Sequence, residues 1–332
     1  MVTTDQRISA LAELGERLQP GYAPFAQAME QAEAANPWFT RDNIQLAAEA
    51  IRSLLRPEAL RSWLAAYPRL PVLRPRRLGL VLAGNIPLVG FHDFLCAFLS
   101  GHHLFLKLSS KDSVLFSFVL QELDELIPGL NQTVHVVERL ADAEAVIATG
   151  SNTTSAYFRR YFGKVPHILR GHRNAAAILS GEETPDELAA LGRDVFSYFG
   201  LGCRNVSKLL LPKGYPVAIL SDYWQDYQHV IFHNKYRNNY DYYRAVFLIN
   251  RVEHTAGPLV LLRNEPTLAS PVAVLHYEFY EDEQALTAIL QRDAPQLQCL
   301  VGRRHIPFGR AQFPTLTDYA DGVDTLQFLS QL

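Results

Sequence analysis

The chain has 332 residues, of which 48% are hydrophobic and 20% are charged, and its formal net charge is −3. This composition is typical of a globular protein with room for two domains, and it excludes disorder as the main state. The near balance of 31 Lys and Arg against 34 Asp and Glu gives no electrostatic case for a nucleic-acid partner.

The N-terminal residues lack the apolar core of a signal peptide. The apolar region 78–108 is interrupted by Asn85 and by several His residues, which argues against a membrane span. The three cysteines, Cys96, Cys203 and Cys299, are odd in number and widely spaced, so we expect neither a disulfide framework nor a metal site. The sequence therefore predicts a cytoplasmic protein.

Apolar residues recur every three or four positions over the first seventy residues, which predicts helices. Beyond Arg77, short apolar runs alternate with helical segments, a pattern typical of βαβ units and a parallel sheet. The predicted strands are 78–83, 103–107, 134–137, 145–149, 174–179, 208–211, 241–250, 260–262, 272–277 and 298–301. The predicted helices between them are 88–99, 114–126, 185–199, 215–234 and 282–291. The fold class is thus α/β, with a Rossmann-type parallel sheet.

The turn 83–87 follows a predicted strand and precedes a helix, with Pro87 at the expected first helical position. Its Asn85 would lie at the C-terminal edge of the parallel sheet, where open α/β folds bind ligands. The carboxamide could donate a hydrogen bond to an oxyanion. Taken alone, Asn85 is more simply explained as a helix cap.

Two other strand ends are expected at this edge of the sheet. Gly150 and Ser151 begin a helix whose N-terminus suits an anion such as a pyrophosphate, with an ordinary N-cap as the simpler alternative. Lys107 ends a strand and can hold a ribose or a 2′-phosphate, or it is a surface cation. Each of these signals is weak by itself.

Cys203 follows two glycines, Gly200 and Gly202, between a predicted helix and a strand. Such a bend would expose the thiol to a cleft, and Arg204 or a local dipole could stabilise the thiolate. Cys96 and Cys299 lie in apolar runs and are expected to be inert core thiols.

The order of these landmarks resembles the aldehyde dehydrogenase superfamily. There, an asparagine in a proline-containing turn is followed by a strand ending in Lys-x-Ser, a Gly-Ser helix start, a glycine-rich segment and the catalytic cysteine. The matching residues are Asn85, Lys107 with Ser109, Gly150 with Ser151, the segment 169–174 that contains Gly171, and Cys203. The segments 307–312 and 319–325 are similar to the acyl-CoA reductases that make fatty aldehyde for bacterial bioluminescence.

The resemblance implies residues 1–172 as a helical N-terminus and nicotinamide-cofactor-binding domain, 173–310 as the catalytic domain, and 311–332 as a tail that docks on the body or on a partner subunit. It implies an oxidoreductase that reduces an acyl-CoA, expected to be fatty acyl, to the aldehyde. Catalysis would use Cys203 and Asn85. Cofactor binding would use Lys107, Ser109, Ser110, Lys111, Gly150, Ser151 and Gly171. The substrate source would be an acyl-CoA or an acyl-donating protein, and a homo-oligomer is expected.

Two departures from the superfamily pattern refine this expectation. The glutamate that activates water in aldehyde-oxidising members is replaced by Leu169, or by Arg170 if the alignment slips by one, and neither is a general base. Ser110 stands where a ribose-binding carboxylate is common, and Lys111 follows it, which favours NADPH while leaving NADH open.

The aromatic stretch 223–243 is interpreted as the wall of an acyl tunnel or as a subunit contact, with helix packing as the simpler explanation. Its His229 and His233 have a four-residue spacing, but the glutamate of a metalloprotease-type motif is absent. Two other functions stay open: a reductase of an acyl phosphate such as γ-glutamyl phosphate, and a catalytically silent subunit that binds an acyl donor.

Overall fold

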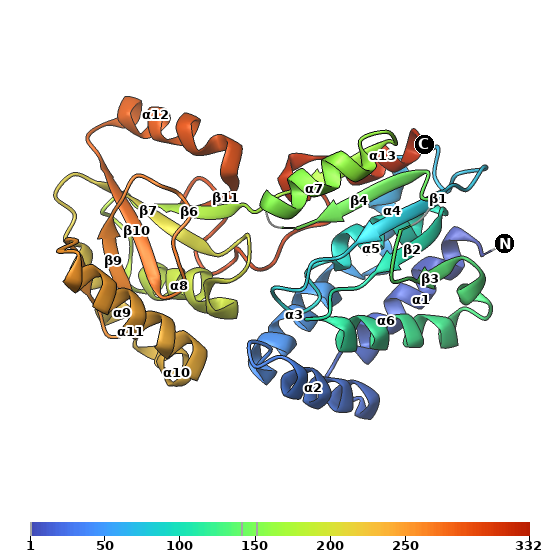
Figure 1. Ribbon diagram of the computed structural model, residues 1–332, viewed down its shortest axis with the longest axis horizontal. Coiled ribbons are helices and arrows are strands. Elements are labelled where there is room, and N and C mark those ends of the chain that lie inside the picture. The colour runs from blue at the N-terminus through green and yellow to red at the C-terminus, as the bar shows by residue number, and fades with distance from the viewer. Residues whose placement is uncertain (1, 141, 151) are drawn as a thin grey trace. The chain divides into compact units, whose positions relative to one another are not determined.

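The structure is a computed structural model that describes residues 2–140, 142–150 and 152–332. The chain divides into two compact units, coloured by residue number in Figure 1. The first unit comprises residues 1–172 together with 314–332, and the second comprises residues 173–313.

The N-terminal region of the first unit is helical, as the sequence predicts. Its helices are α1 (Thr4–Arg17), α2 (Ala23–Ala35), α3 (Arg41–Leu54) and α4 (Pro57–Ala65). Thr3 caps α1 through a capping box with Gln6, and Pro57 begins α4, so local sequence sets both starts. The apolar faces of these helices pack into the core of the unit.

The first sheet has five strands in the order β3-β2-β1-β4-β5, and every pairing is parallel. Its strands are β1 (Arg77–Val81), β2 (His103–Lys107), β3 (Val134–Val136), β4 (Ala145–Thr149) and β5 (His167–Arg170). The connecting helices are α5 (Phe91–Ser100), α6 (Ser113–Leu126) and α7 (Asn152–Phe162). The predicted parallel sheet is therefore confirmed, and its central strands are buried because they are apolar on both faces.

Two details of this unit differ from the prediction. The helix after β1 begins at Phe91 instead of Leu88, so Pro87 is not its first residue. Leu88 has a φ of 53°, a left-handed conformation that delays the helix. The second difference is β5, which was not predicted because its ends, His167 and Arg170, are polar and the strand is short.

The second unit is built on a six-stranded sheet in the order β11-β6-β7-β10-β9-β8. All its pairings are parallel except that of β8 with β9. Its strands are β6 (Asn174–Ile178), β7 (Val206–Pro212), β8 (Thr255–Ala256), β9 (Leu261–Asn264), β10 (Val274–Tyr280) and β11 (Leu297–Val301). Its helices are α8 (Pro185–Phe196), α9 (Leu220–Tyr223), α10 (His229–Phe232), α11 (Asn234–Ile249) and α12 (Glu283–Asp293).

The strand predicted over 241–250 is wrong, because these residues form the second half of α11. The buried residues of α11 are Tyr236, Tyr240 and Phe247, whose spacing of four and seven places them on one helical face. Tyr236 and Tyr240 also donate hydrogen bonds to the carbonyls of Leu259 and Gly257, which fixes this helix against the chain that follows.

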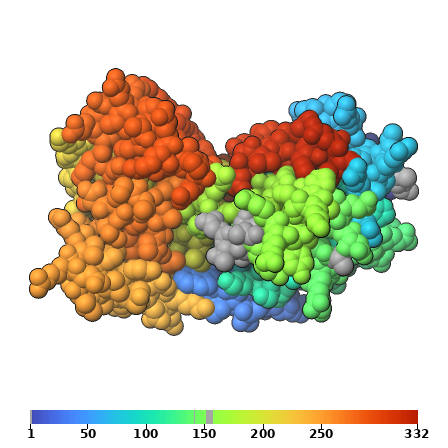
Figure 2. All heavy atoms as spheres, turned by 45° about the horizontal axis from the view of Figure 1, so that its top comes forward, coloured from blue at the N-terminus to red at the C-terminus, as the bar shows by residue number. Residues whose placement is uncertain are grey.

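Residues 314–332 return to the first unit and end in α13 (Thr325–Ser330). There Tyr319 hydrogen-bonds the Tyr67 hydroxyl at 2.7 Å and accepts from the Trp63 indole at 3.0 Å. Figures 1 and 2 show this C-terminal segment, in red, beside α7. Among the helices that the structure describes, none has the length and apolar character needed to cross a membrane.

Candidate functional site

The residues expected to bind a cofactor, and the catalytic candidate Asn85, lie at or after the ends of four neighbouring strands of the first sheet. Lys107 at the end of β2 lies opposite Val81 of β1, and Val81 lies opposite Ala148 of β4. Thr149 of β4 lies opposite Arg170 at the end of β5. Since parallel strands end at the same edge, the segments that follow them, with Asn85, Ser109, Gly150 and Gly171, begin at one edge of the sheet.

The turn after β1 packs directly on the segment after β2. A Cβ atom placed on Gly84 would lie only 2.6 Å from Ser109 Oγ and 3.0 Å from Asp112 Cβ, so only glycine fits. Asn85 follows and is half-buried. The structure therefore brings the Asn85 turn together with Ser109, two positions that the sequence suggested separately.

The cations of this edge are accessible. Lys107 is exposed and donates a 2.8 Å hydrogen bond from Nζ to the Glu138 carbonyl, while Ser110 and Lys111 are also exposed. The Gly150 N–H donates to the Arg170 carbonyl at 3.1 Å, so this N–H is already used between β4 and β5. Ser151 lies outside the described residues.

Arg170 occupies the region where a catalytic base was sought. It is 2% exposed, and its guanidinium makes a two-point ion pair with Asp93 of α5 at 3.0 and 2.9 Å. It also donates to Thr325 Oγ1 at 2.8 Å and to the Ala320 carbonyl, both in the C-terminal segment. Its neighbour Leu169 is half-buried. Neither side chain can accept a proton from water.

Cys203 lies in the second unit, in the bend between α8 and β7, and is half-buried. Tyr198 and Phe199 enter the bend with φ of 52° and 57°, a left-handed conformation that few non-glycine residues adopt. The buried Asn205 holds the bend: its Oδ1 accepts from the Gly202 N–H at 2.8 Å. Its Nδ2 donates to the carbonyls of Asp194 at 3.0 Å and Ser197 at 2.8 Å.

A second set of contacts ties this bend to the segment 309–313. The Arg204 side chain donates from Nε to the Ala311 carbonyl at 2.5 Å. The fully buried Asp194 carboxylate accepts from the N–H groups of Gly309 at 2.6 Å and Ala311 at 2.9 Å. Burial raises the pKa of Asp194 to about 6, against these two hydrogen bonds that lower it. Arg204 therefore positions backbone here, where the sequence suggested a partner for the thiolate.

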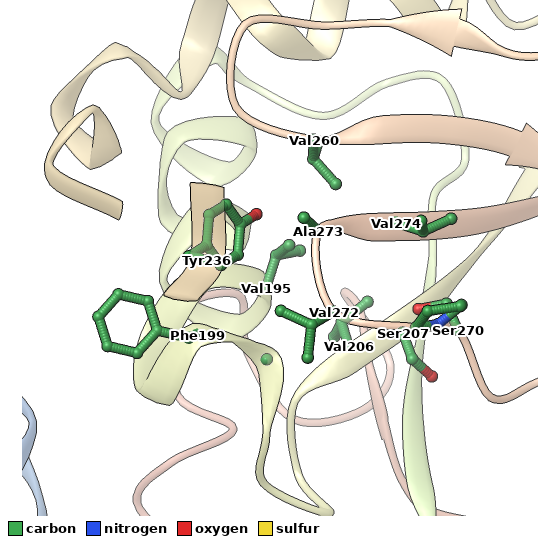
Figure 3. Close-up of a pocket in the computed structure, with 12 residues that line it drawn as sticks. Val195, Phe199, Val206, Ser207, Tyr236, Val260, Ser270, Val272, Ala273 and Val274 are labelled. Carbon is green, nitrogen blue, oxygen red and sulfur yellow. The ribbon is translucent and has the colours of Figure 1, made fainter. Parts of the chain in front are cut away.

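A small cavity of mixed polar and apolar lining adjoins the cysteine bend. Gly200 and Val206, three residues on either side of Cys203, both line it. Figure 3 shows Val195, Val206 and Val272 gathered between Tyr236 of α11 and the strand that carries Val274. The cavity measures about 20 Å³, room for about one water molecule. The predicted wall segment 223–243 thus contributes one lining residue, Tyr236.

The other two thiols differ from each other. Cys96 is buried in α5, and burial raises its pKa well above the usual value, as expected of an inert core thiol. Cys299 is half-buried on the edge strand β11, so the expectation of a core position is wrong. An edge strand has a neighbour on one side only, which leaves part of its side chains accessible.

The sequence interpretation missed three buried residues. Asp112 accepts a hydrogen bond from the turn that carries Asn85, and Asp194 and Asn205 lie beside the bend that carries Cys203. A signal existed for Asp194: it lies three residues after the buried Leu191, on the apolar face of α8. A charged residue at such a position needs buried partners.

The fold is that of the aldehyde dehydrogenases. A Mycobacterium tuberculosis aldehyde dehydrogenase complexed with NAD⁺ matches with a TM-score of 0.63 and 15% identity, over 86% of this chain and 70% of that one. A Pseudomonas syringae aldehyde dehydrogenase variant complexed with NAD⁺ and octanal matches with a TM-score of 0.63 and 16% identity, over 86% and 69%. A Sinorhizobium meliloti NAD-dependent aldehyde dehydrogenase gives 0.64 and 14%, over 91% and 70%.

Among curated proteins, N-succinylglutamate 5-semialdehyde dehydrogenase 2 of Caulobacter vibrioides is 24% identical over 232 residues, 63% of this chain. The match spans about half, 47%, of that relative. The family model for acyl-CoA reductase (LuxC) matches residues 11–215, more than half of the chain. The chain therefore belongs to the acyl-CoA reductase (LuxC) family of oxidoreductases, and its fold is that of the aldehyde dehydrogenases.

Proposed function

We propose that the chain reduces a fatty acyl-CoA thioester to the aldehyde, with Cys203 as the nucleophile and NADPH as the reductant. The observation that carries this proposal is the Cys203 bend, where Asn205 holds the backbone beside a half-buried thiol and a small cavity adjoins it. A rigid bend keeps a nucleophile in place for attack. Membership of the acyl-CoA reductase family supports the same reaction.

In the first step, the Cys203 thiolate attacks the thioester carbonyl carbon and forms a new carbon–sulfur bond. Asn85 and the backbone N–H of Cys203 donate hydrogen bonds to the resulting oxyanion, and loss of such a donor typically lowers the rate by about 10²–10³-fold. The bond from carbon to the CoA sulfur then breaks, and CoA leaves as the thiolate. The acyl group is now bound to Cys203.

The groups at the edge of the first sheet suit a phosphorylated nicotinamide cofactor. Lys107, Ser109 and Lys111 supply two cations and a hydroxyl after β2, the donor chemistry that a ribose 2′-phosphate requires. No carboxylate occupies position 110, where it would repel that phosphate. When bound, NADPH supplies the hydride that reduces the carbonyl carbon of the acyl-cysteine. The sulfur of Cys203 then leaves as the thiolate, and the aldehyde is released.

The residues at 169 and 170 support reduction over hydrolysis. Leu169 is apolar, and the Arg170 guanidinium is buried in its ion pair with Asp93. Without a general base at this place, water attacks the thioester slowly. The acyl group on Cys203 therefore persists until hydride or CoA removes it.

Aliphatic residues make up much of the lining of the cavity beside Cys203, together with Ser207, Ser270 and Tyr236, and an aliphatic acyl group would contact the valines. The Pseudomonas syringae relative, complexed with octanal, has an aliphatic ligand of this kind. The cavity is too small for a long chain without side-chain movement, so the assignment of a fatty acyl substrate rests on the family. The acyl group would come from acyl-CoA or from an acyl-donating protein. The active form of the chain would be a cytoplasmic homo-oligomer.

A second candidate is reduction of an acyl phosphate such as γ-glutamyl phosphate by the same cysteine, because its product, a glutamate-derived semialdehyde, is of the class named for the curated relative. Its name designates a semialdehyde dehydrogenase, and the matched region covers 63% of this chain. A comparison of γ-glutamyl phosphate with a long-chain acyl-CoA as substrates decides between the two.

The test is the mass of the intact protein after mixing with palmitoyl-CoA in the absence of cofactor, followed by peptide mapping. One acyl group on Cys203, released as the aldehyde by NADPH faster than by NADH, is the expected result. Cys203→Ala should take up none, whereas Cys299→Ala, which removes the other half-buried thiol, should behave as the wild type. A folded protein without an adduct would contradict the proposal and leave the acyl-phosphate and silent-subunit functions.

A further inference from the structure

Asp112 precedes α6 and is 4% exposed. An aspartate at this N-cap position usually accepts a hydrogen bond from the first turn of its own helix. Asp112 makes no such bond. Its Oδ2 instead accepts a 2.7 Å hydrogen bond from the backbone N–H of Leu88, in the turn that follows β1. The carboxyl group thus accepts its hydrogen bond from the turn that follows a different strand.

The turn that Asp112 contacts is held at both ends. At its start, Gly84 packs so closely on Ser109 and Asp112 that no Cβ fits. At its end, Leu88 adopts a φ of 53°, which a leucine enters only when its surroundings impose it. The hydrogen bond from the Leu88 N–H to Asp112 supplies that restraint. Asn85 lies between the two fixed points.

A carboxyl is a costly group at this place. Asp112 Oδ1 has no hydrogen-bond partner among the residues that the structure describes. Burial raises the pKa of Asp112 to about 8, against the hydrogen bond from Leu88 that lowers it. A buried group with one unsatisfied oxygen lowers stability, so packing alone does not explain an aspartate here.

We propose that Asp112 is a positioning residue that fixes the turn 84–88 and thereby places Asn85 for the acylation of Cys203. This inference rests on the proposed function, because it gives Asn85 the oxyanion role. Asp112 itself contacts neither the substrate nor the reacting atoms. It acts through the Leu88 N–H and the turn that bears Asn85.

The first measurement is the single-turnover rate of acylation by palmitoyl-CoA over a range of concentrations. Asp112→Ala should lower the saturating rate by about 10–100-fold, the loss that a misplaced group causes, with little change in the half-saturating concentration. Asp112→Asn keeps a carbonyl oxygen that can accept from Leu88, and should recover most of the rate. In an Asn85→Ala background, Asp112→Ala should have no further effect, because both changes remove the same interaction.

Glu122→Ala is the matched control. Glu122 is also 4% exposed, lies on α6, and accepts from Arg17 at 2.6 Å, away from the turn. Its loss should lower the stability and leave the acylation rate unchanged. Equal rates in Asp112→Ala and Glu122→Ala, or effects of Asp112→Ala and Asn85→Ala that multiply, would overturn the proposal.

Amide hydrogen exchange gives a readout that does not depend on activity. Asp112→Ala should accelerate exchange in the segment 84–91, whereas Glu122→Ala should not. If the wild type takes up no acyl group, the proposed function fails and the role of Asp112 in acylation fails with it. Exchange then still decides whether Asp112 holds the turn. Unchanged exchange at 84–91 in Asp112→Ala would overturn the inference even in an active enzyme.

Discussion

The Asn205 side chain accepts a 2.8 Å hydrogen bond from the Gly202 N–H and so closes the bend that carries Cys203. The same carboxamide reaches back to the end of α8, where it donates to the carbonyls of Asp194 and Ser197. One buried side chain therefore satisfies backbone groups before and within the bend. The position of the thiol depends on a residue with no chemical role of its own.

Asn205→Ala should lower the free energy of unfolding by about 3 kcal/mol, because several buried backbone groups lose their partner at once. It should also change the rate at which iodoacetamide alkylates Cys203, measured by mass spectrometry. Asn250→Ala is the control, since Asn250 is exposed and its side chain donates to the Val246 carbonyl at the end of its own helix. If both variants are equally stable, other contacts hold the bend.

Asp194 should make the stability depend on pH in an unusual direction. Its pKa in the folded chain is raised to about 6, whereas an unfolded aspartate titrates near pH 4. Between these values the folded chain holds a proton that the unfolded chain releases. The contribution of Asp194 to the free energy of unfolding therefore falls as the pH rises, by at most about 1.4 kcal/mol per unit, and is constant above about pH 6.

Denaturant unfolding of the wild type and of Asp194→Asn at several pH values between 4 and 7 measures this effect. The stability of the wild type relative to the variant should decline up to about pH 6 and then level off. Asp226→Asn, a change of an exposed aspartate in the same unit, controls for the introduction of an amide. A constant difference over the whole range would contradict the burial argument.

Arg170→Met should destabilise the first unit by about 3–5 kcal/mol, because the Asp93 carboxylate would be left buried without its cation. Arg303→Met removes a more exposed ion pair, with Glu187, and should lower the stability much less, because solvent screens that pair. Thermal and denaturant unfolding measure both. Combining Arg170→Met with Asp93→Leu should recover part of the loss. No recovery would show that the bond to Thr325 matters more than the ion pair.

Leu169→Glu should convert part of the reductase activity into hydrolysis. A carboxylate at this position would activate water against the acyl group on Cys203, so that palmitate forms without cofactor. The lifetime of the acylated protein, followed by intact mass, should shorten by about 10²-fold, the lower end of the range for general-base effects. Leu169→Gln is the matched control and should retain the wild-type lifetime. Equal lifetimes in the two variants would place the water-activating position elsewhere.

The sequence predicts the parallel sheet and the edge where its strands end, because the apolar runs and their glycine punctuation are local features. The close approach of Ser109 to Gly84 could also have been predicted, since the two residues follow neighbouring strands. The same reasoning failed at α11, where a dense run of Tyr residues has strand propensity, yet Tyr236 and Tyr240 share one helical face. There, packing overrides the local preference.

The hydrogen bonds that hold the turn 84–88 and that tie the Cys203 bend to the segment 309–313 could not be predicted, because each joins residues far apart in the sequence. Asp112 meets Leu88 across 24 residues, and Asp194 meets Gly309 across 115. The position of Arg170 is set in the same way, by Asp93 and Thr325. A buried charge is recognisable in a sequence only as a polar residue in an apolar pattern, and its partner is not specified.

The return of residues 314–332 to the first unit has a consequence for the order of folding. The indole of Trp63 and the hydroxyl of Tyr67 are paired by Tyr319, which is synthesised some 250 residues later. During translation, residues 173–313 can therefore complete their own sheet before the first unit acquires its last contacts. Until then, Arg170 also lacks Thr325, so the N-terminal half leaves the ribosome with a buried cation only partly satisfied. Because contacts this distant in sequence form late, the first unit reaches its native structure only after residues 314–332 have been synthesised.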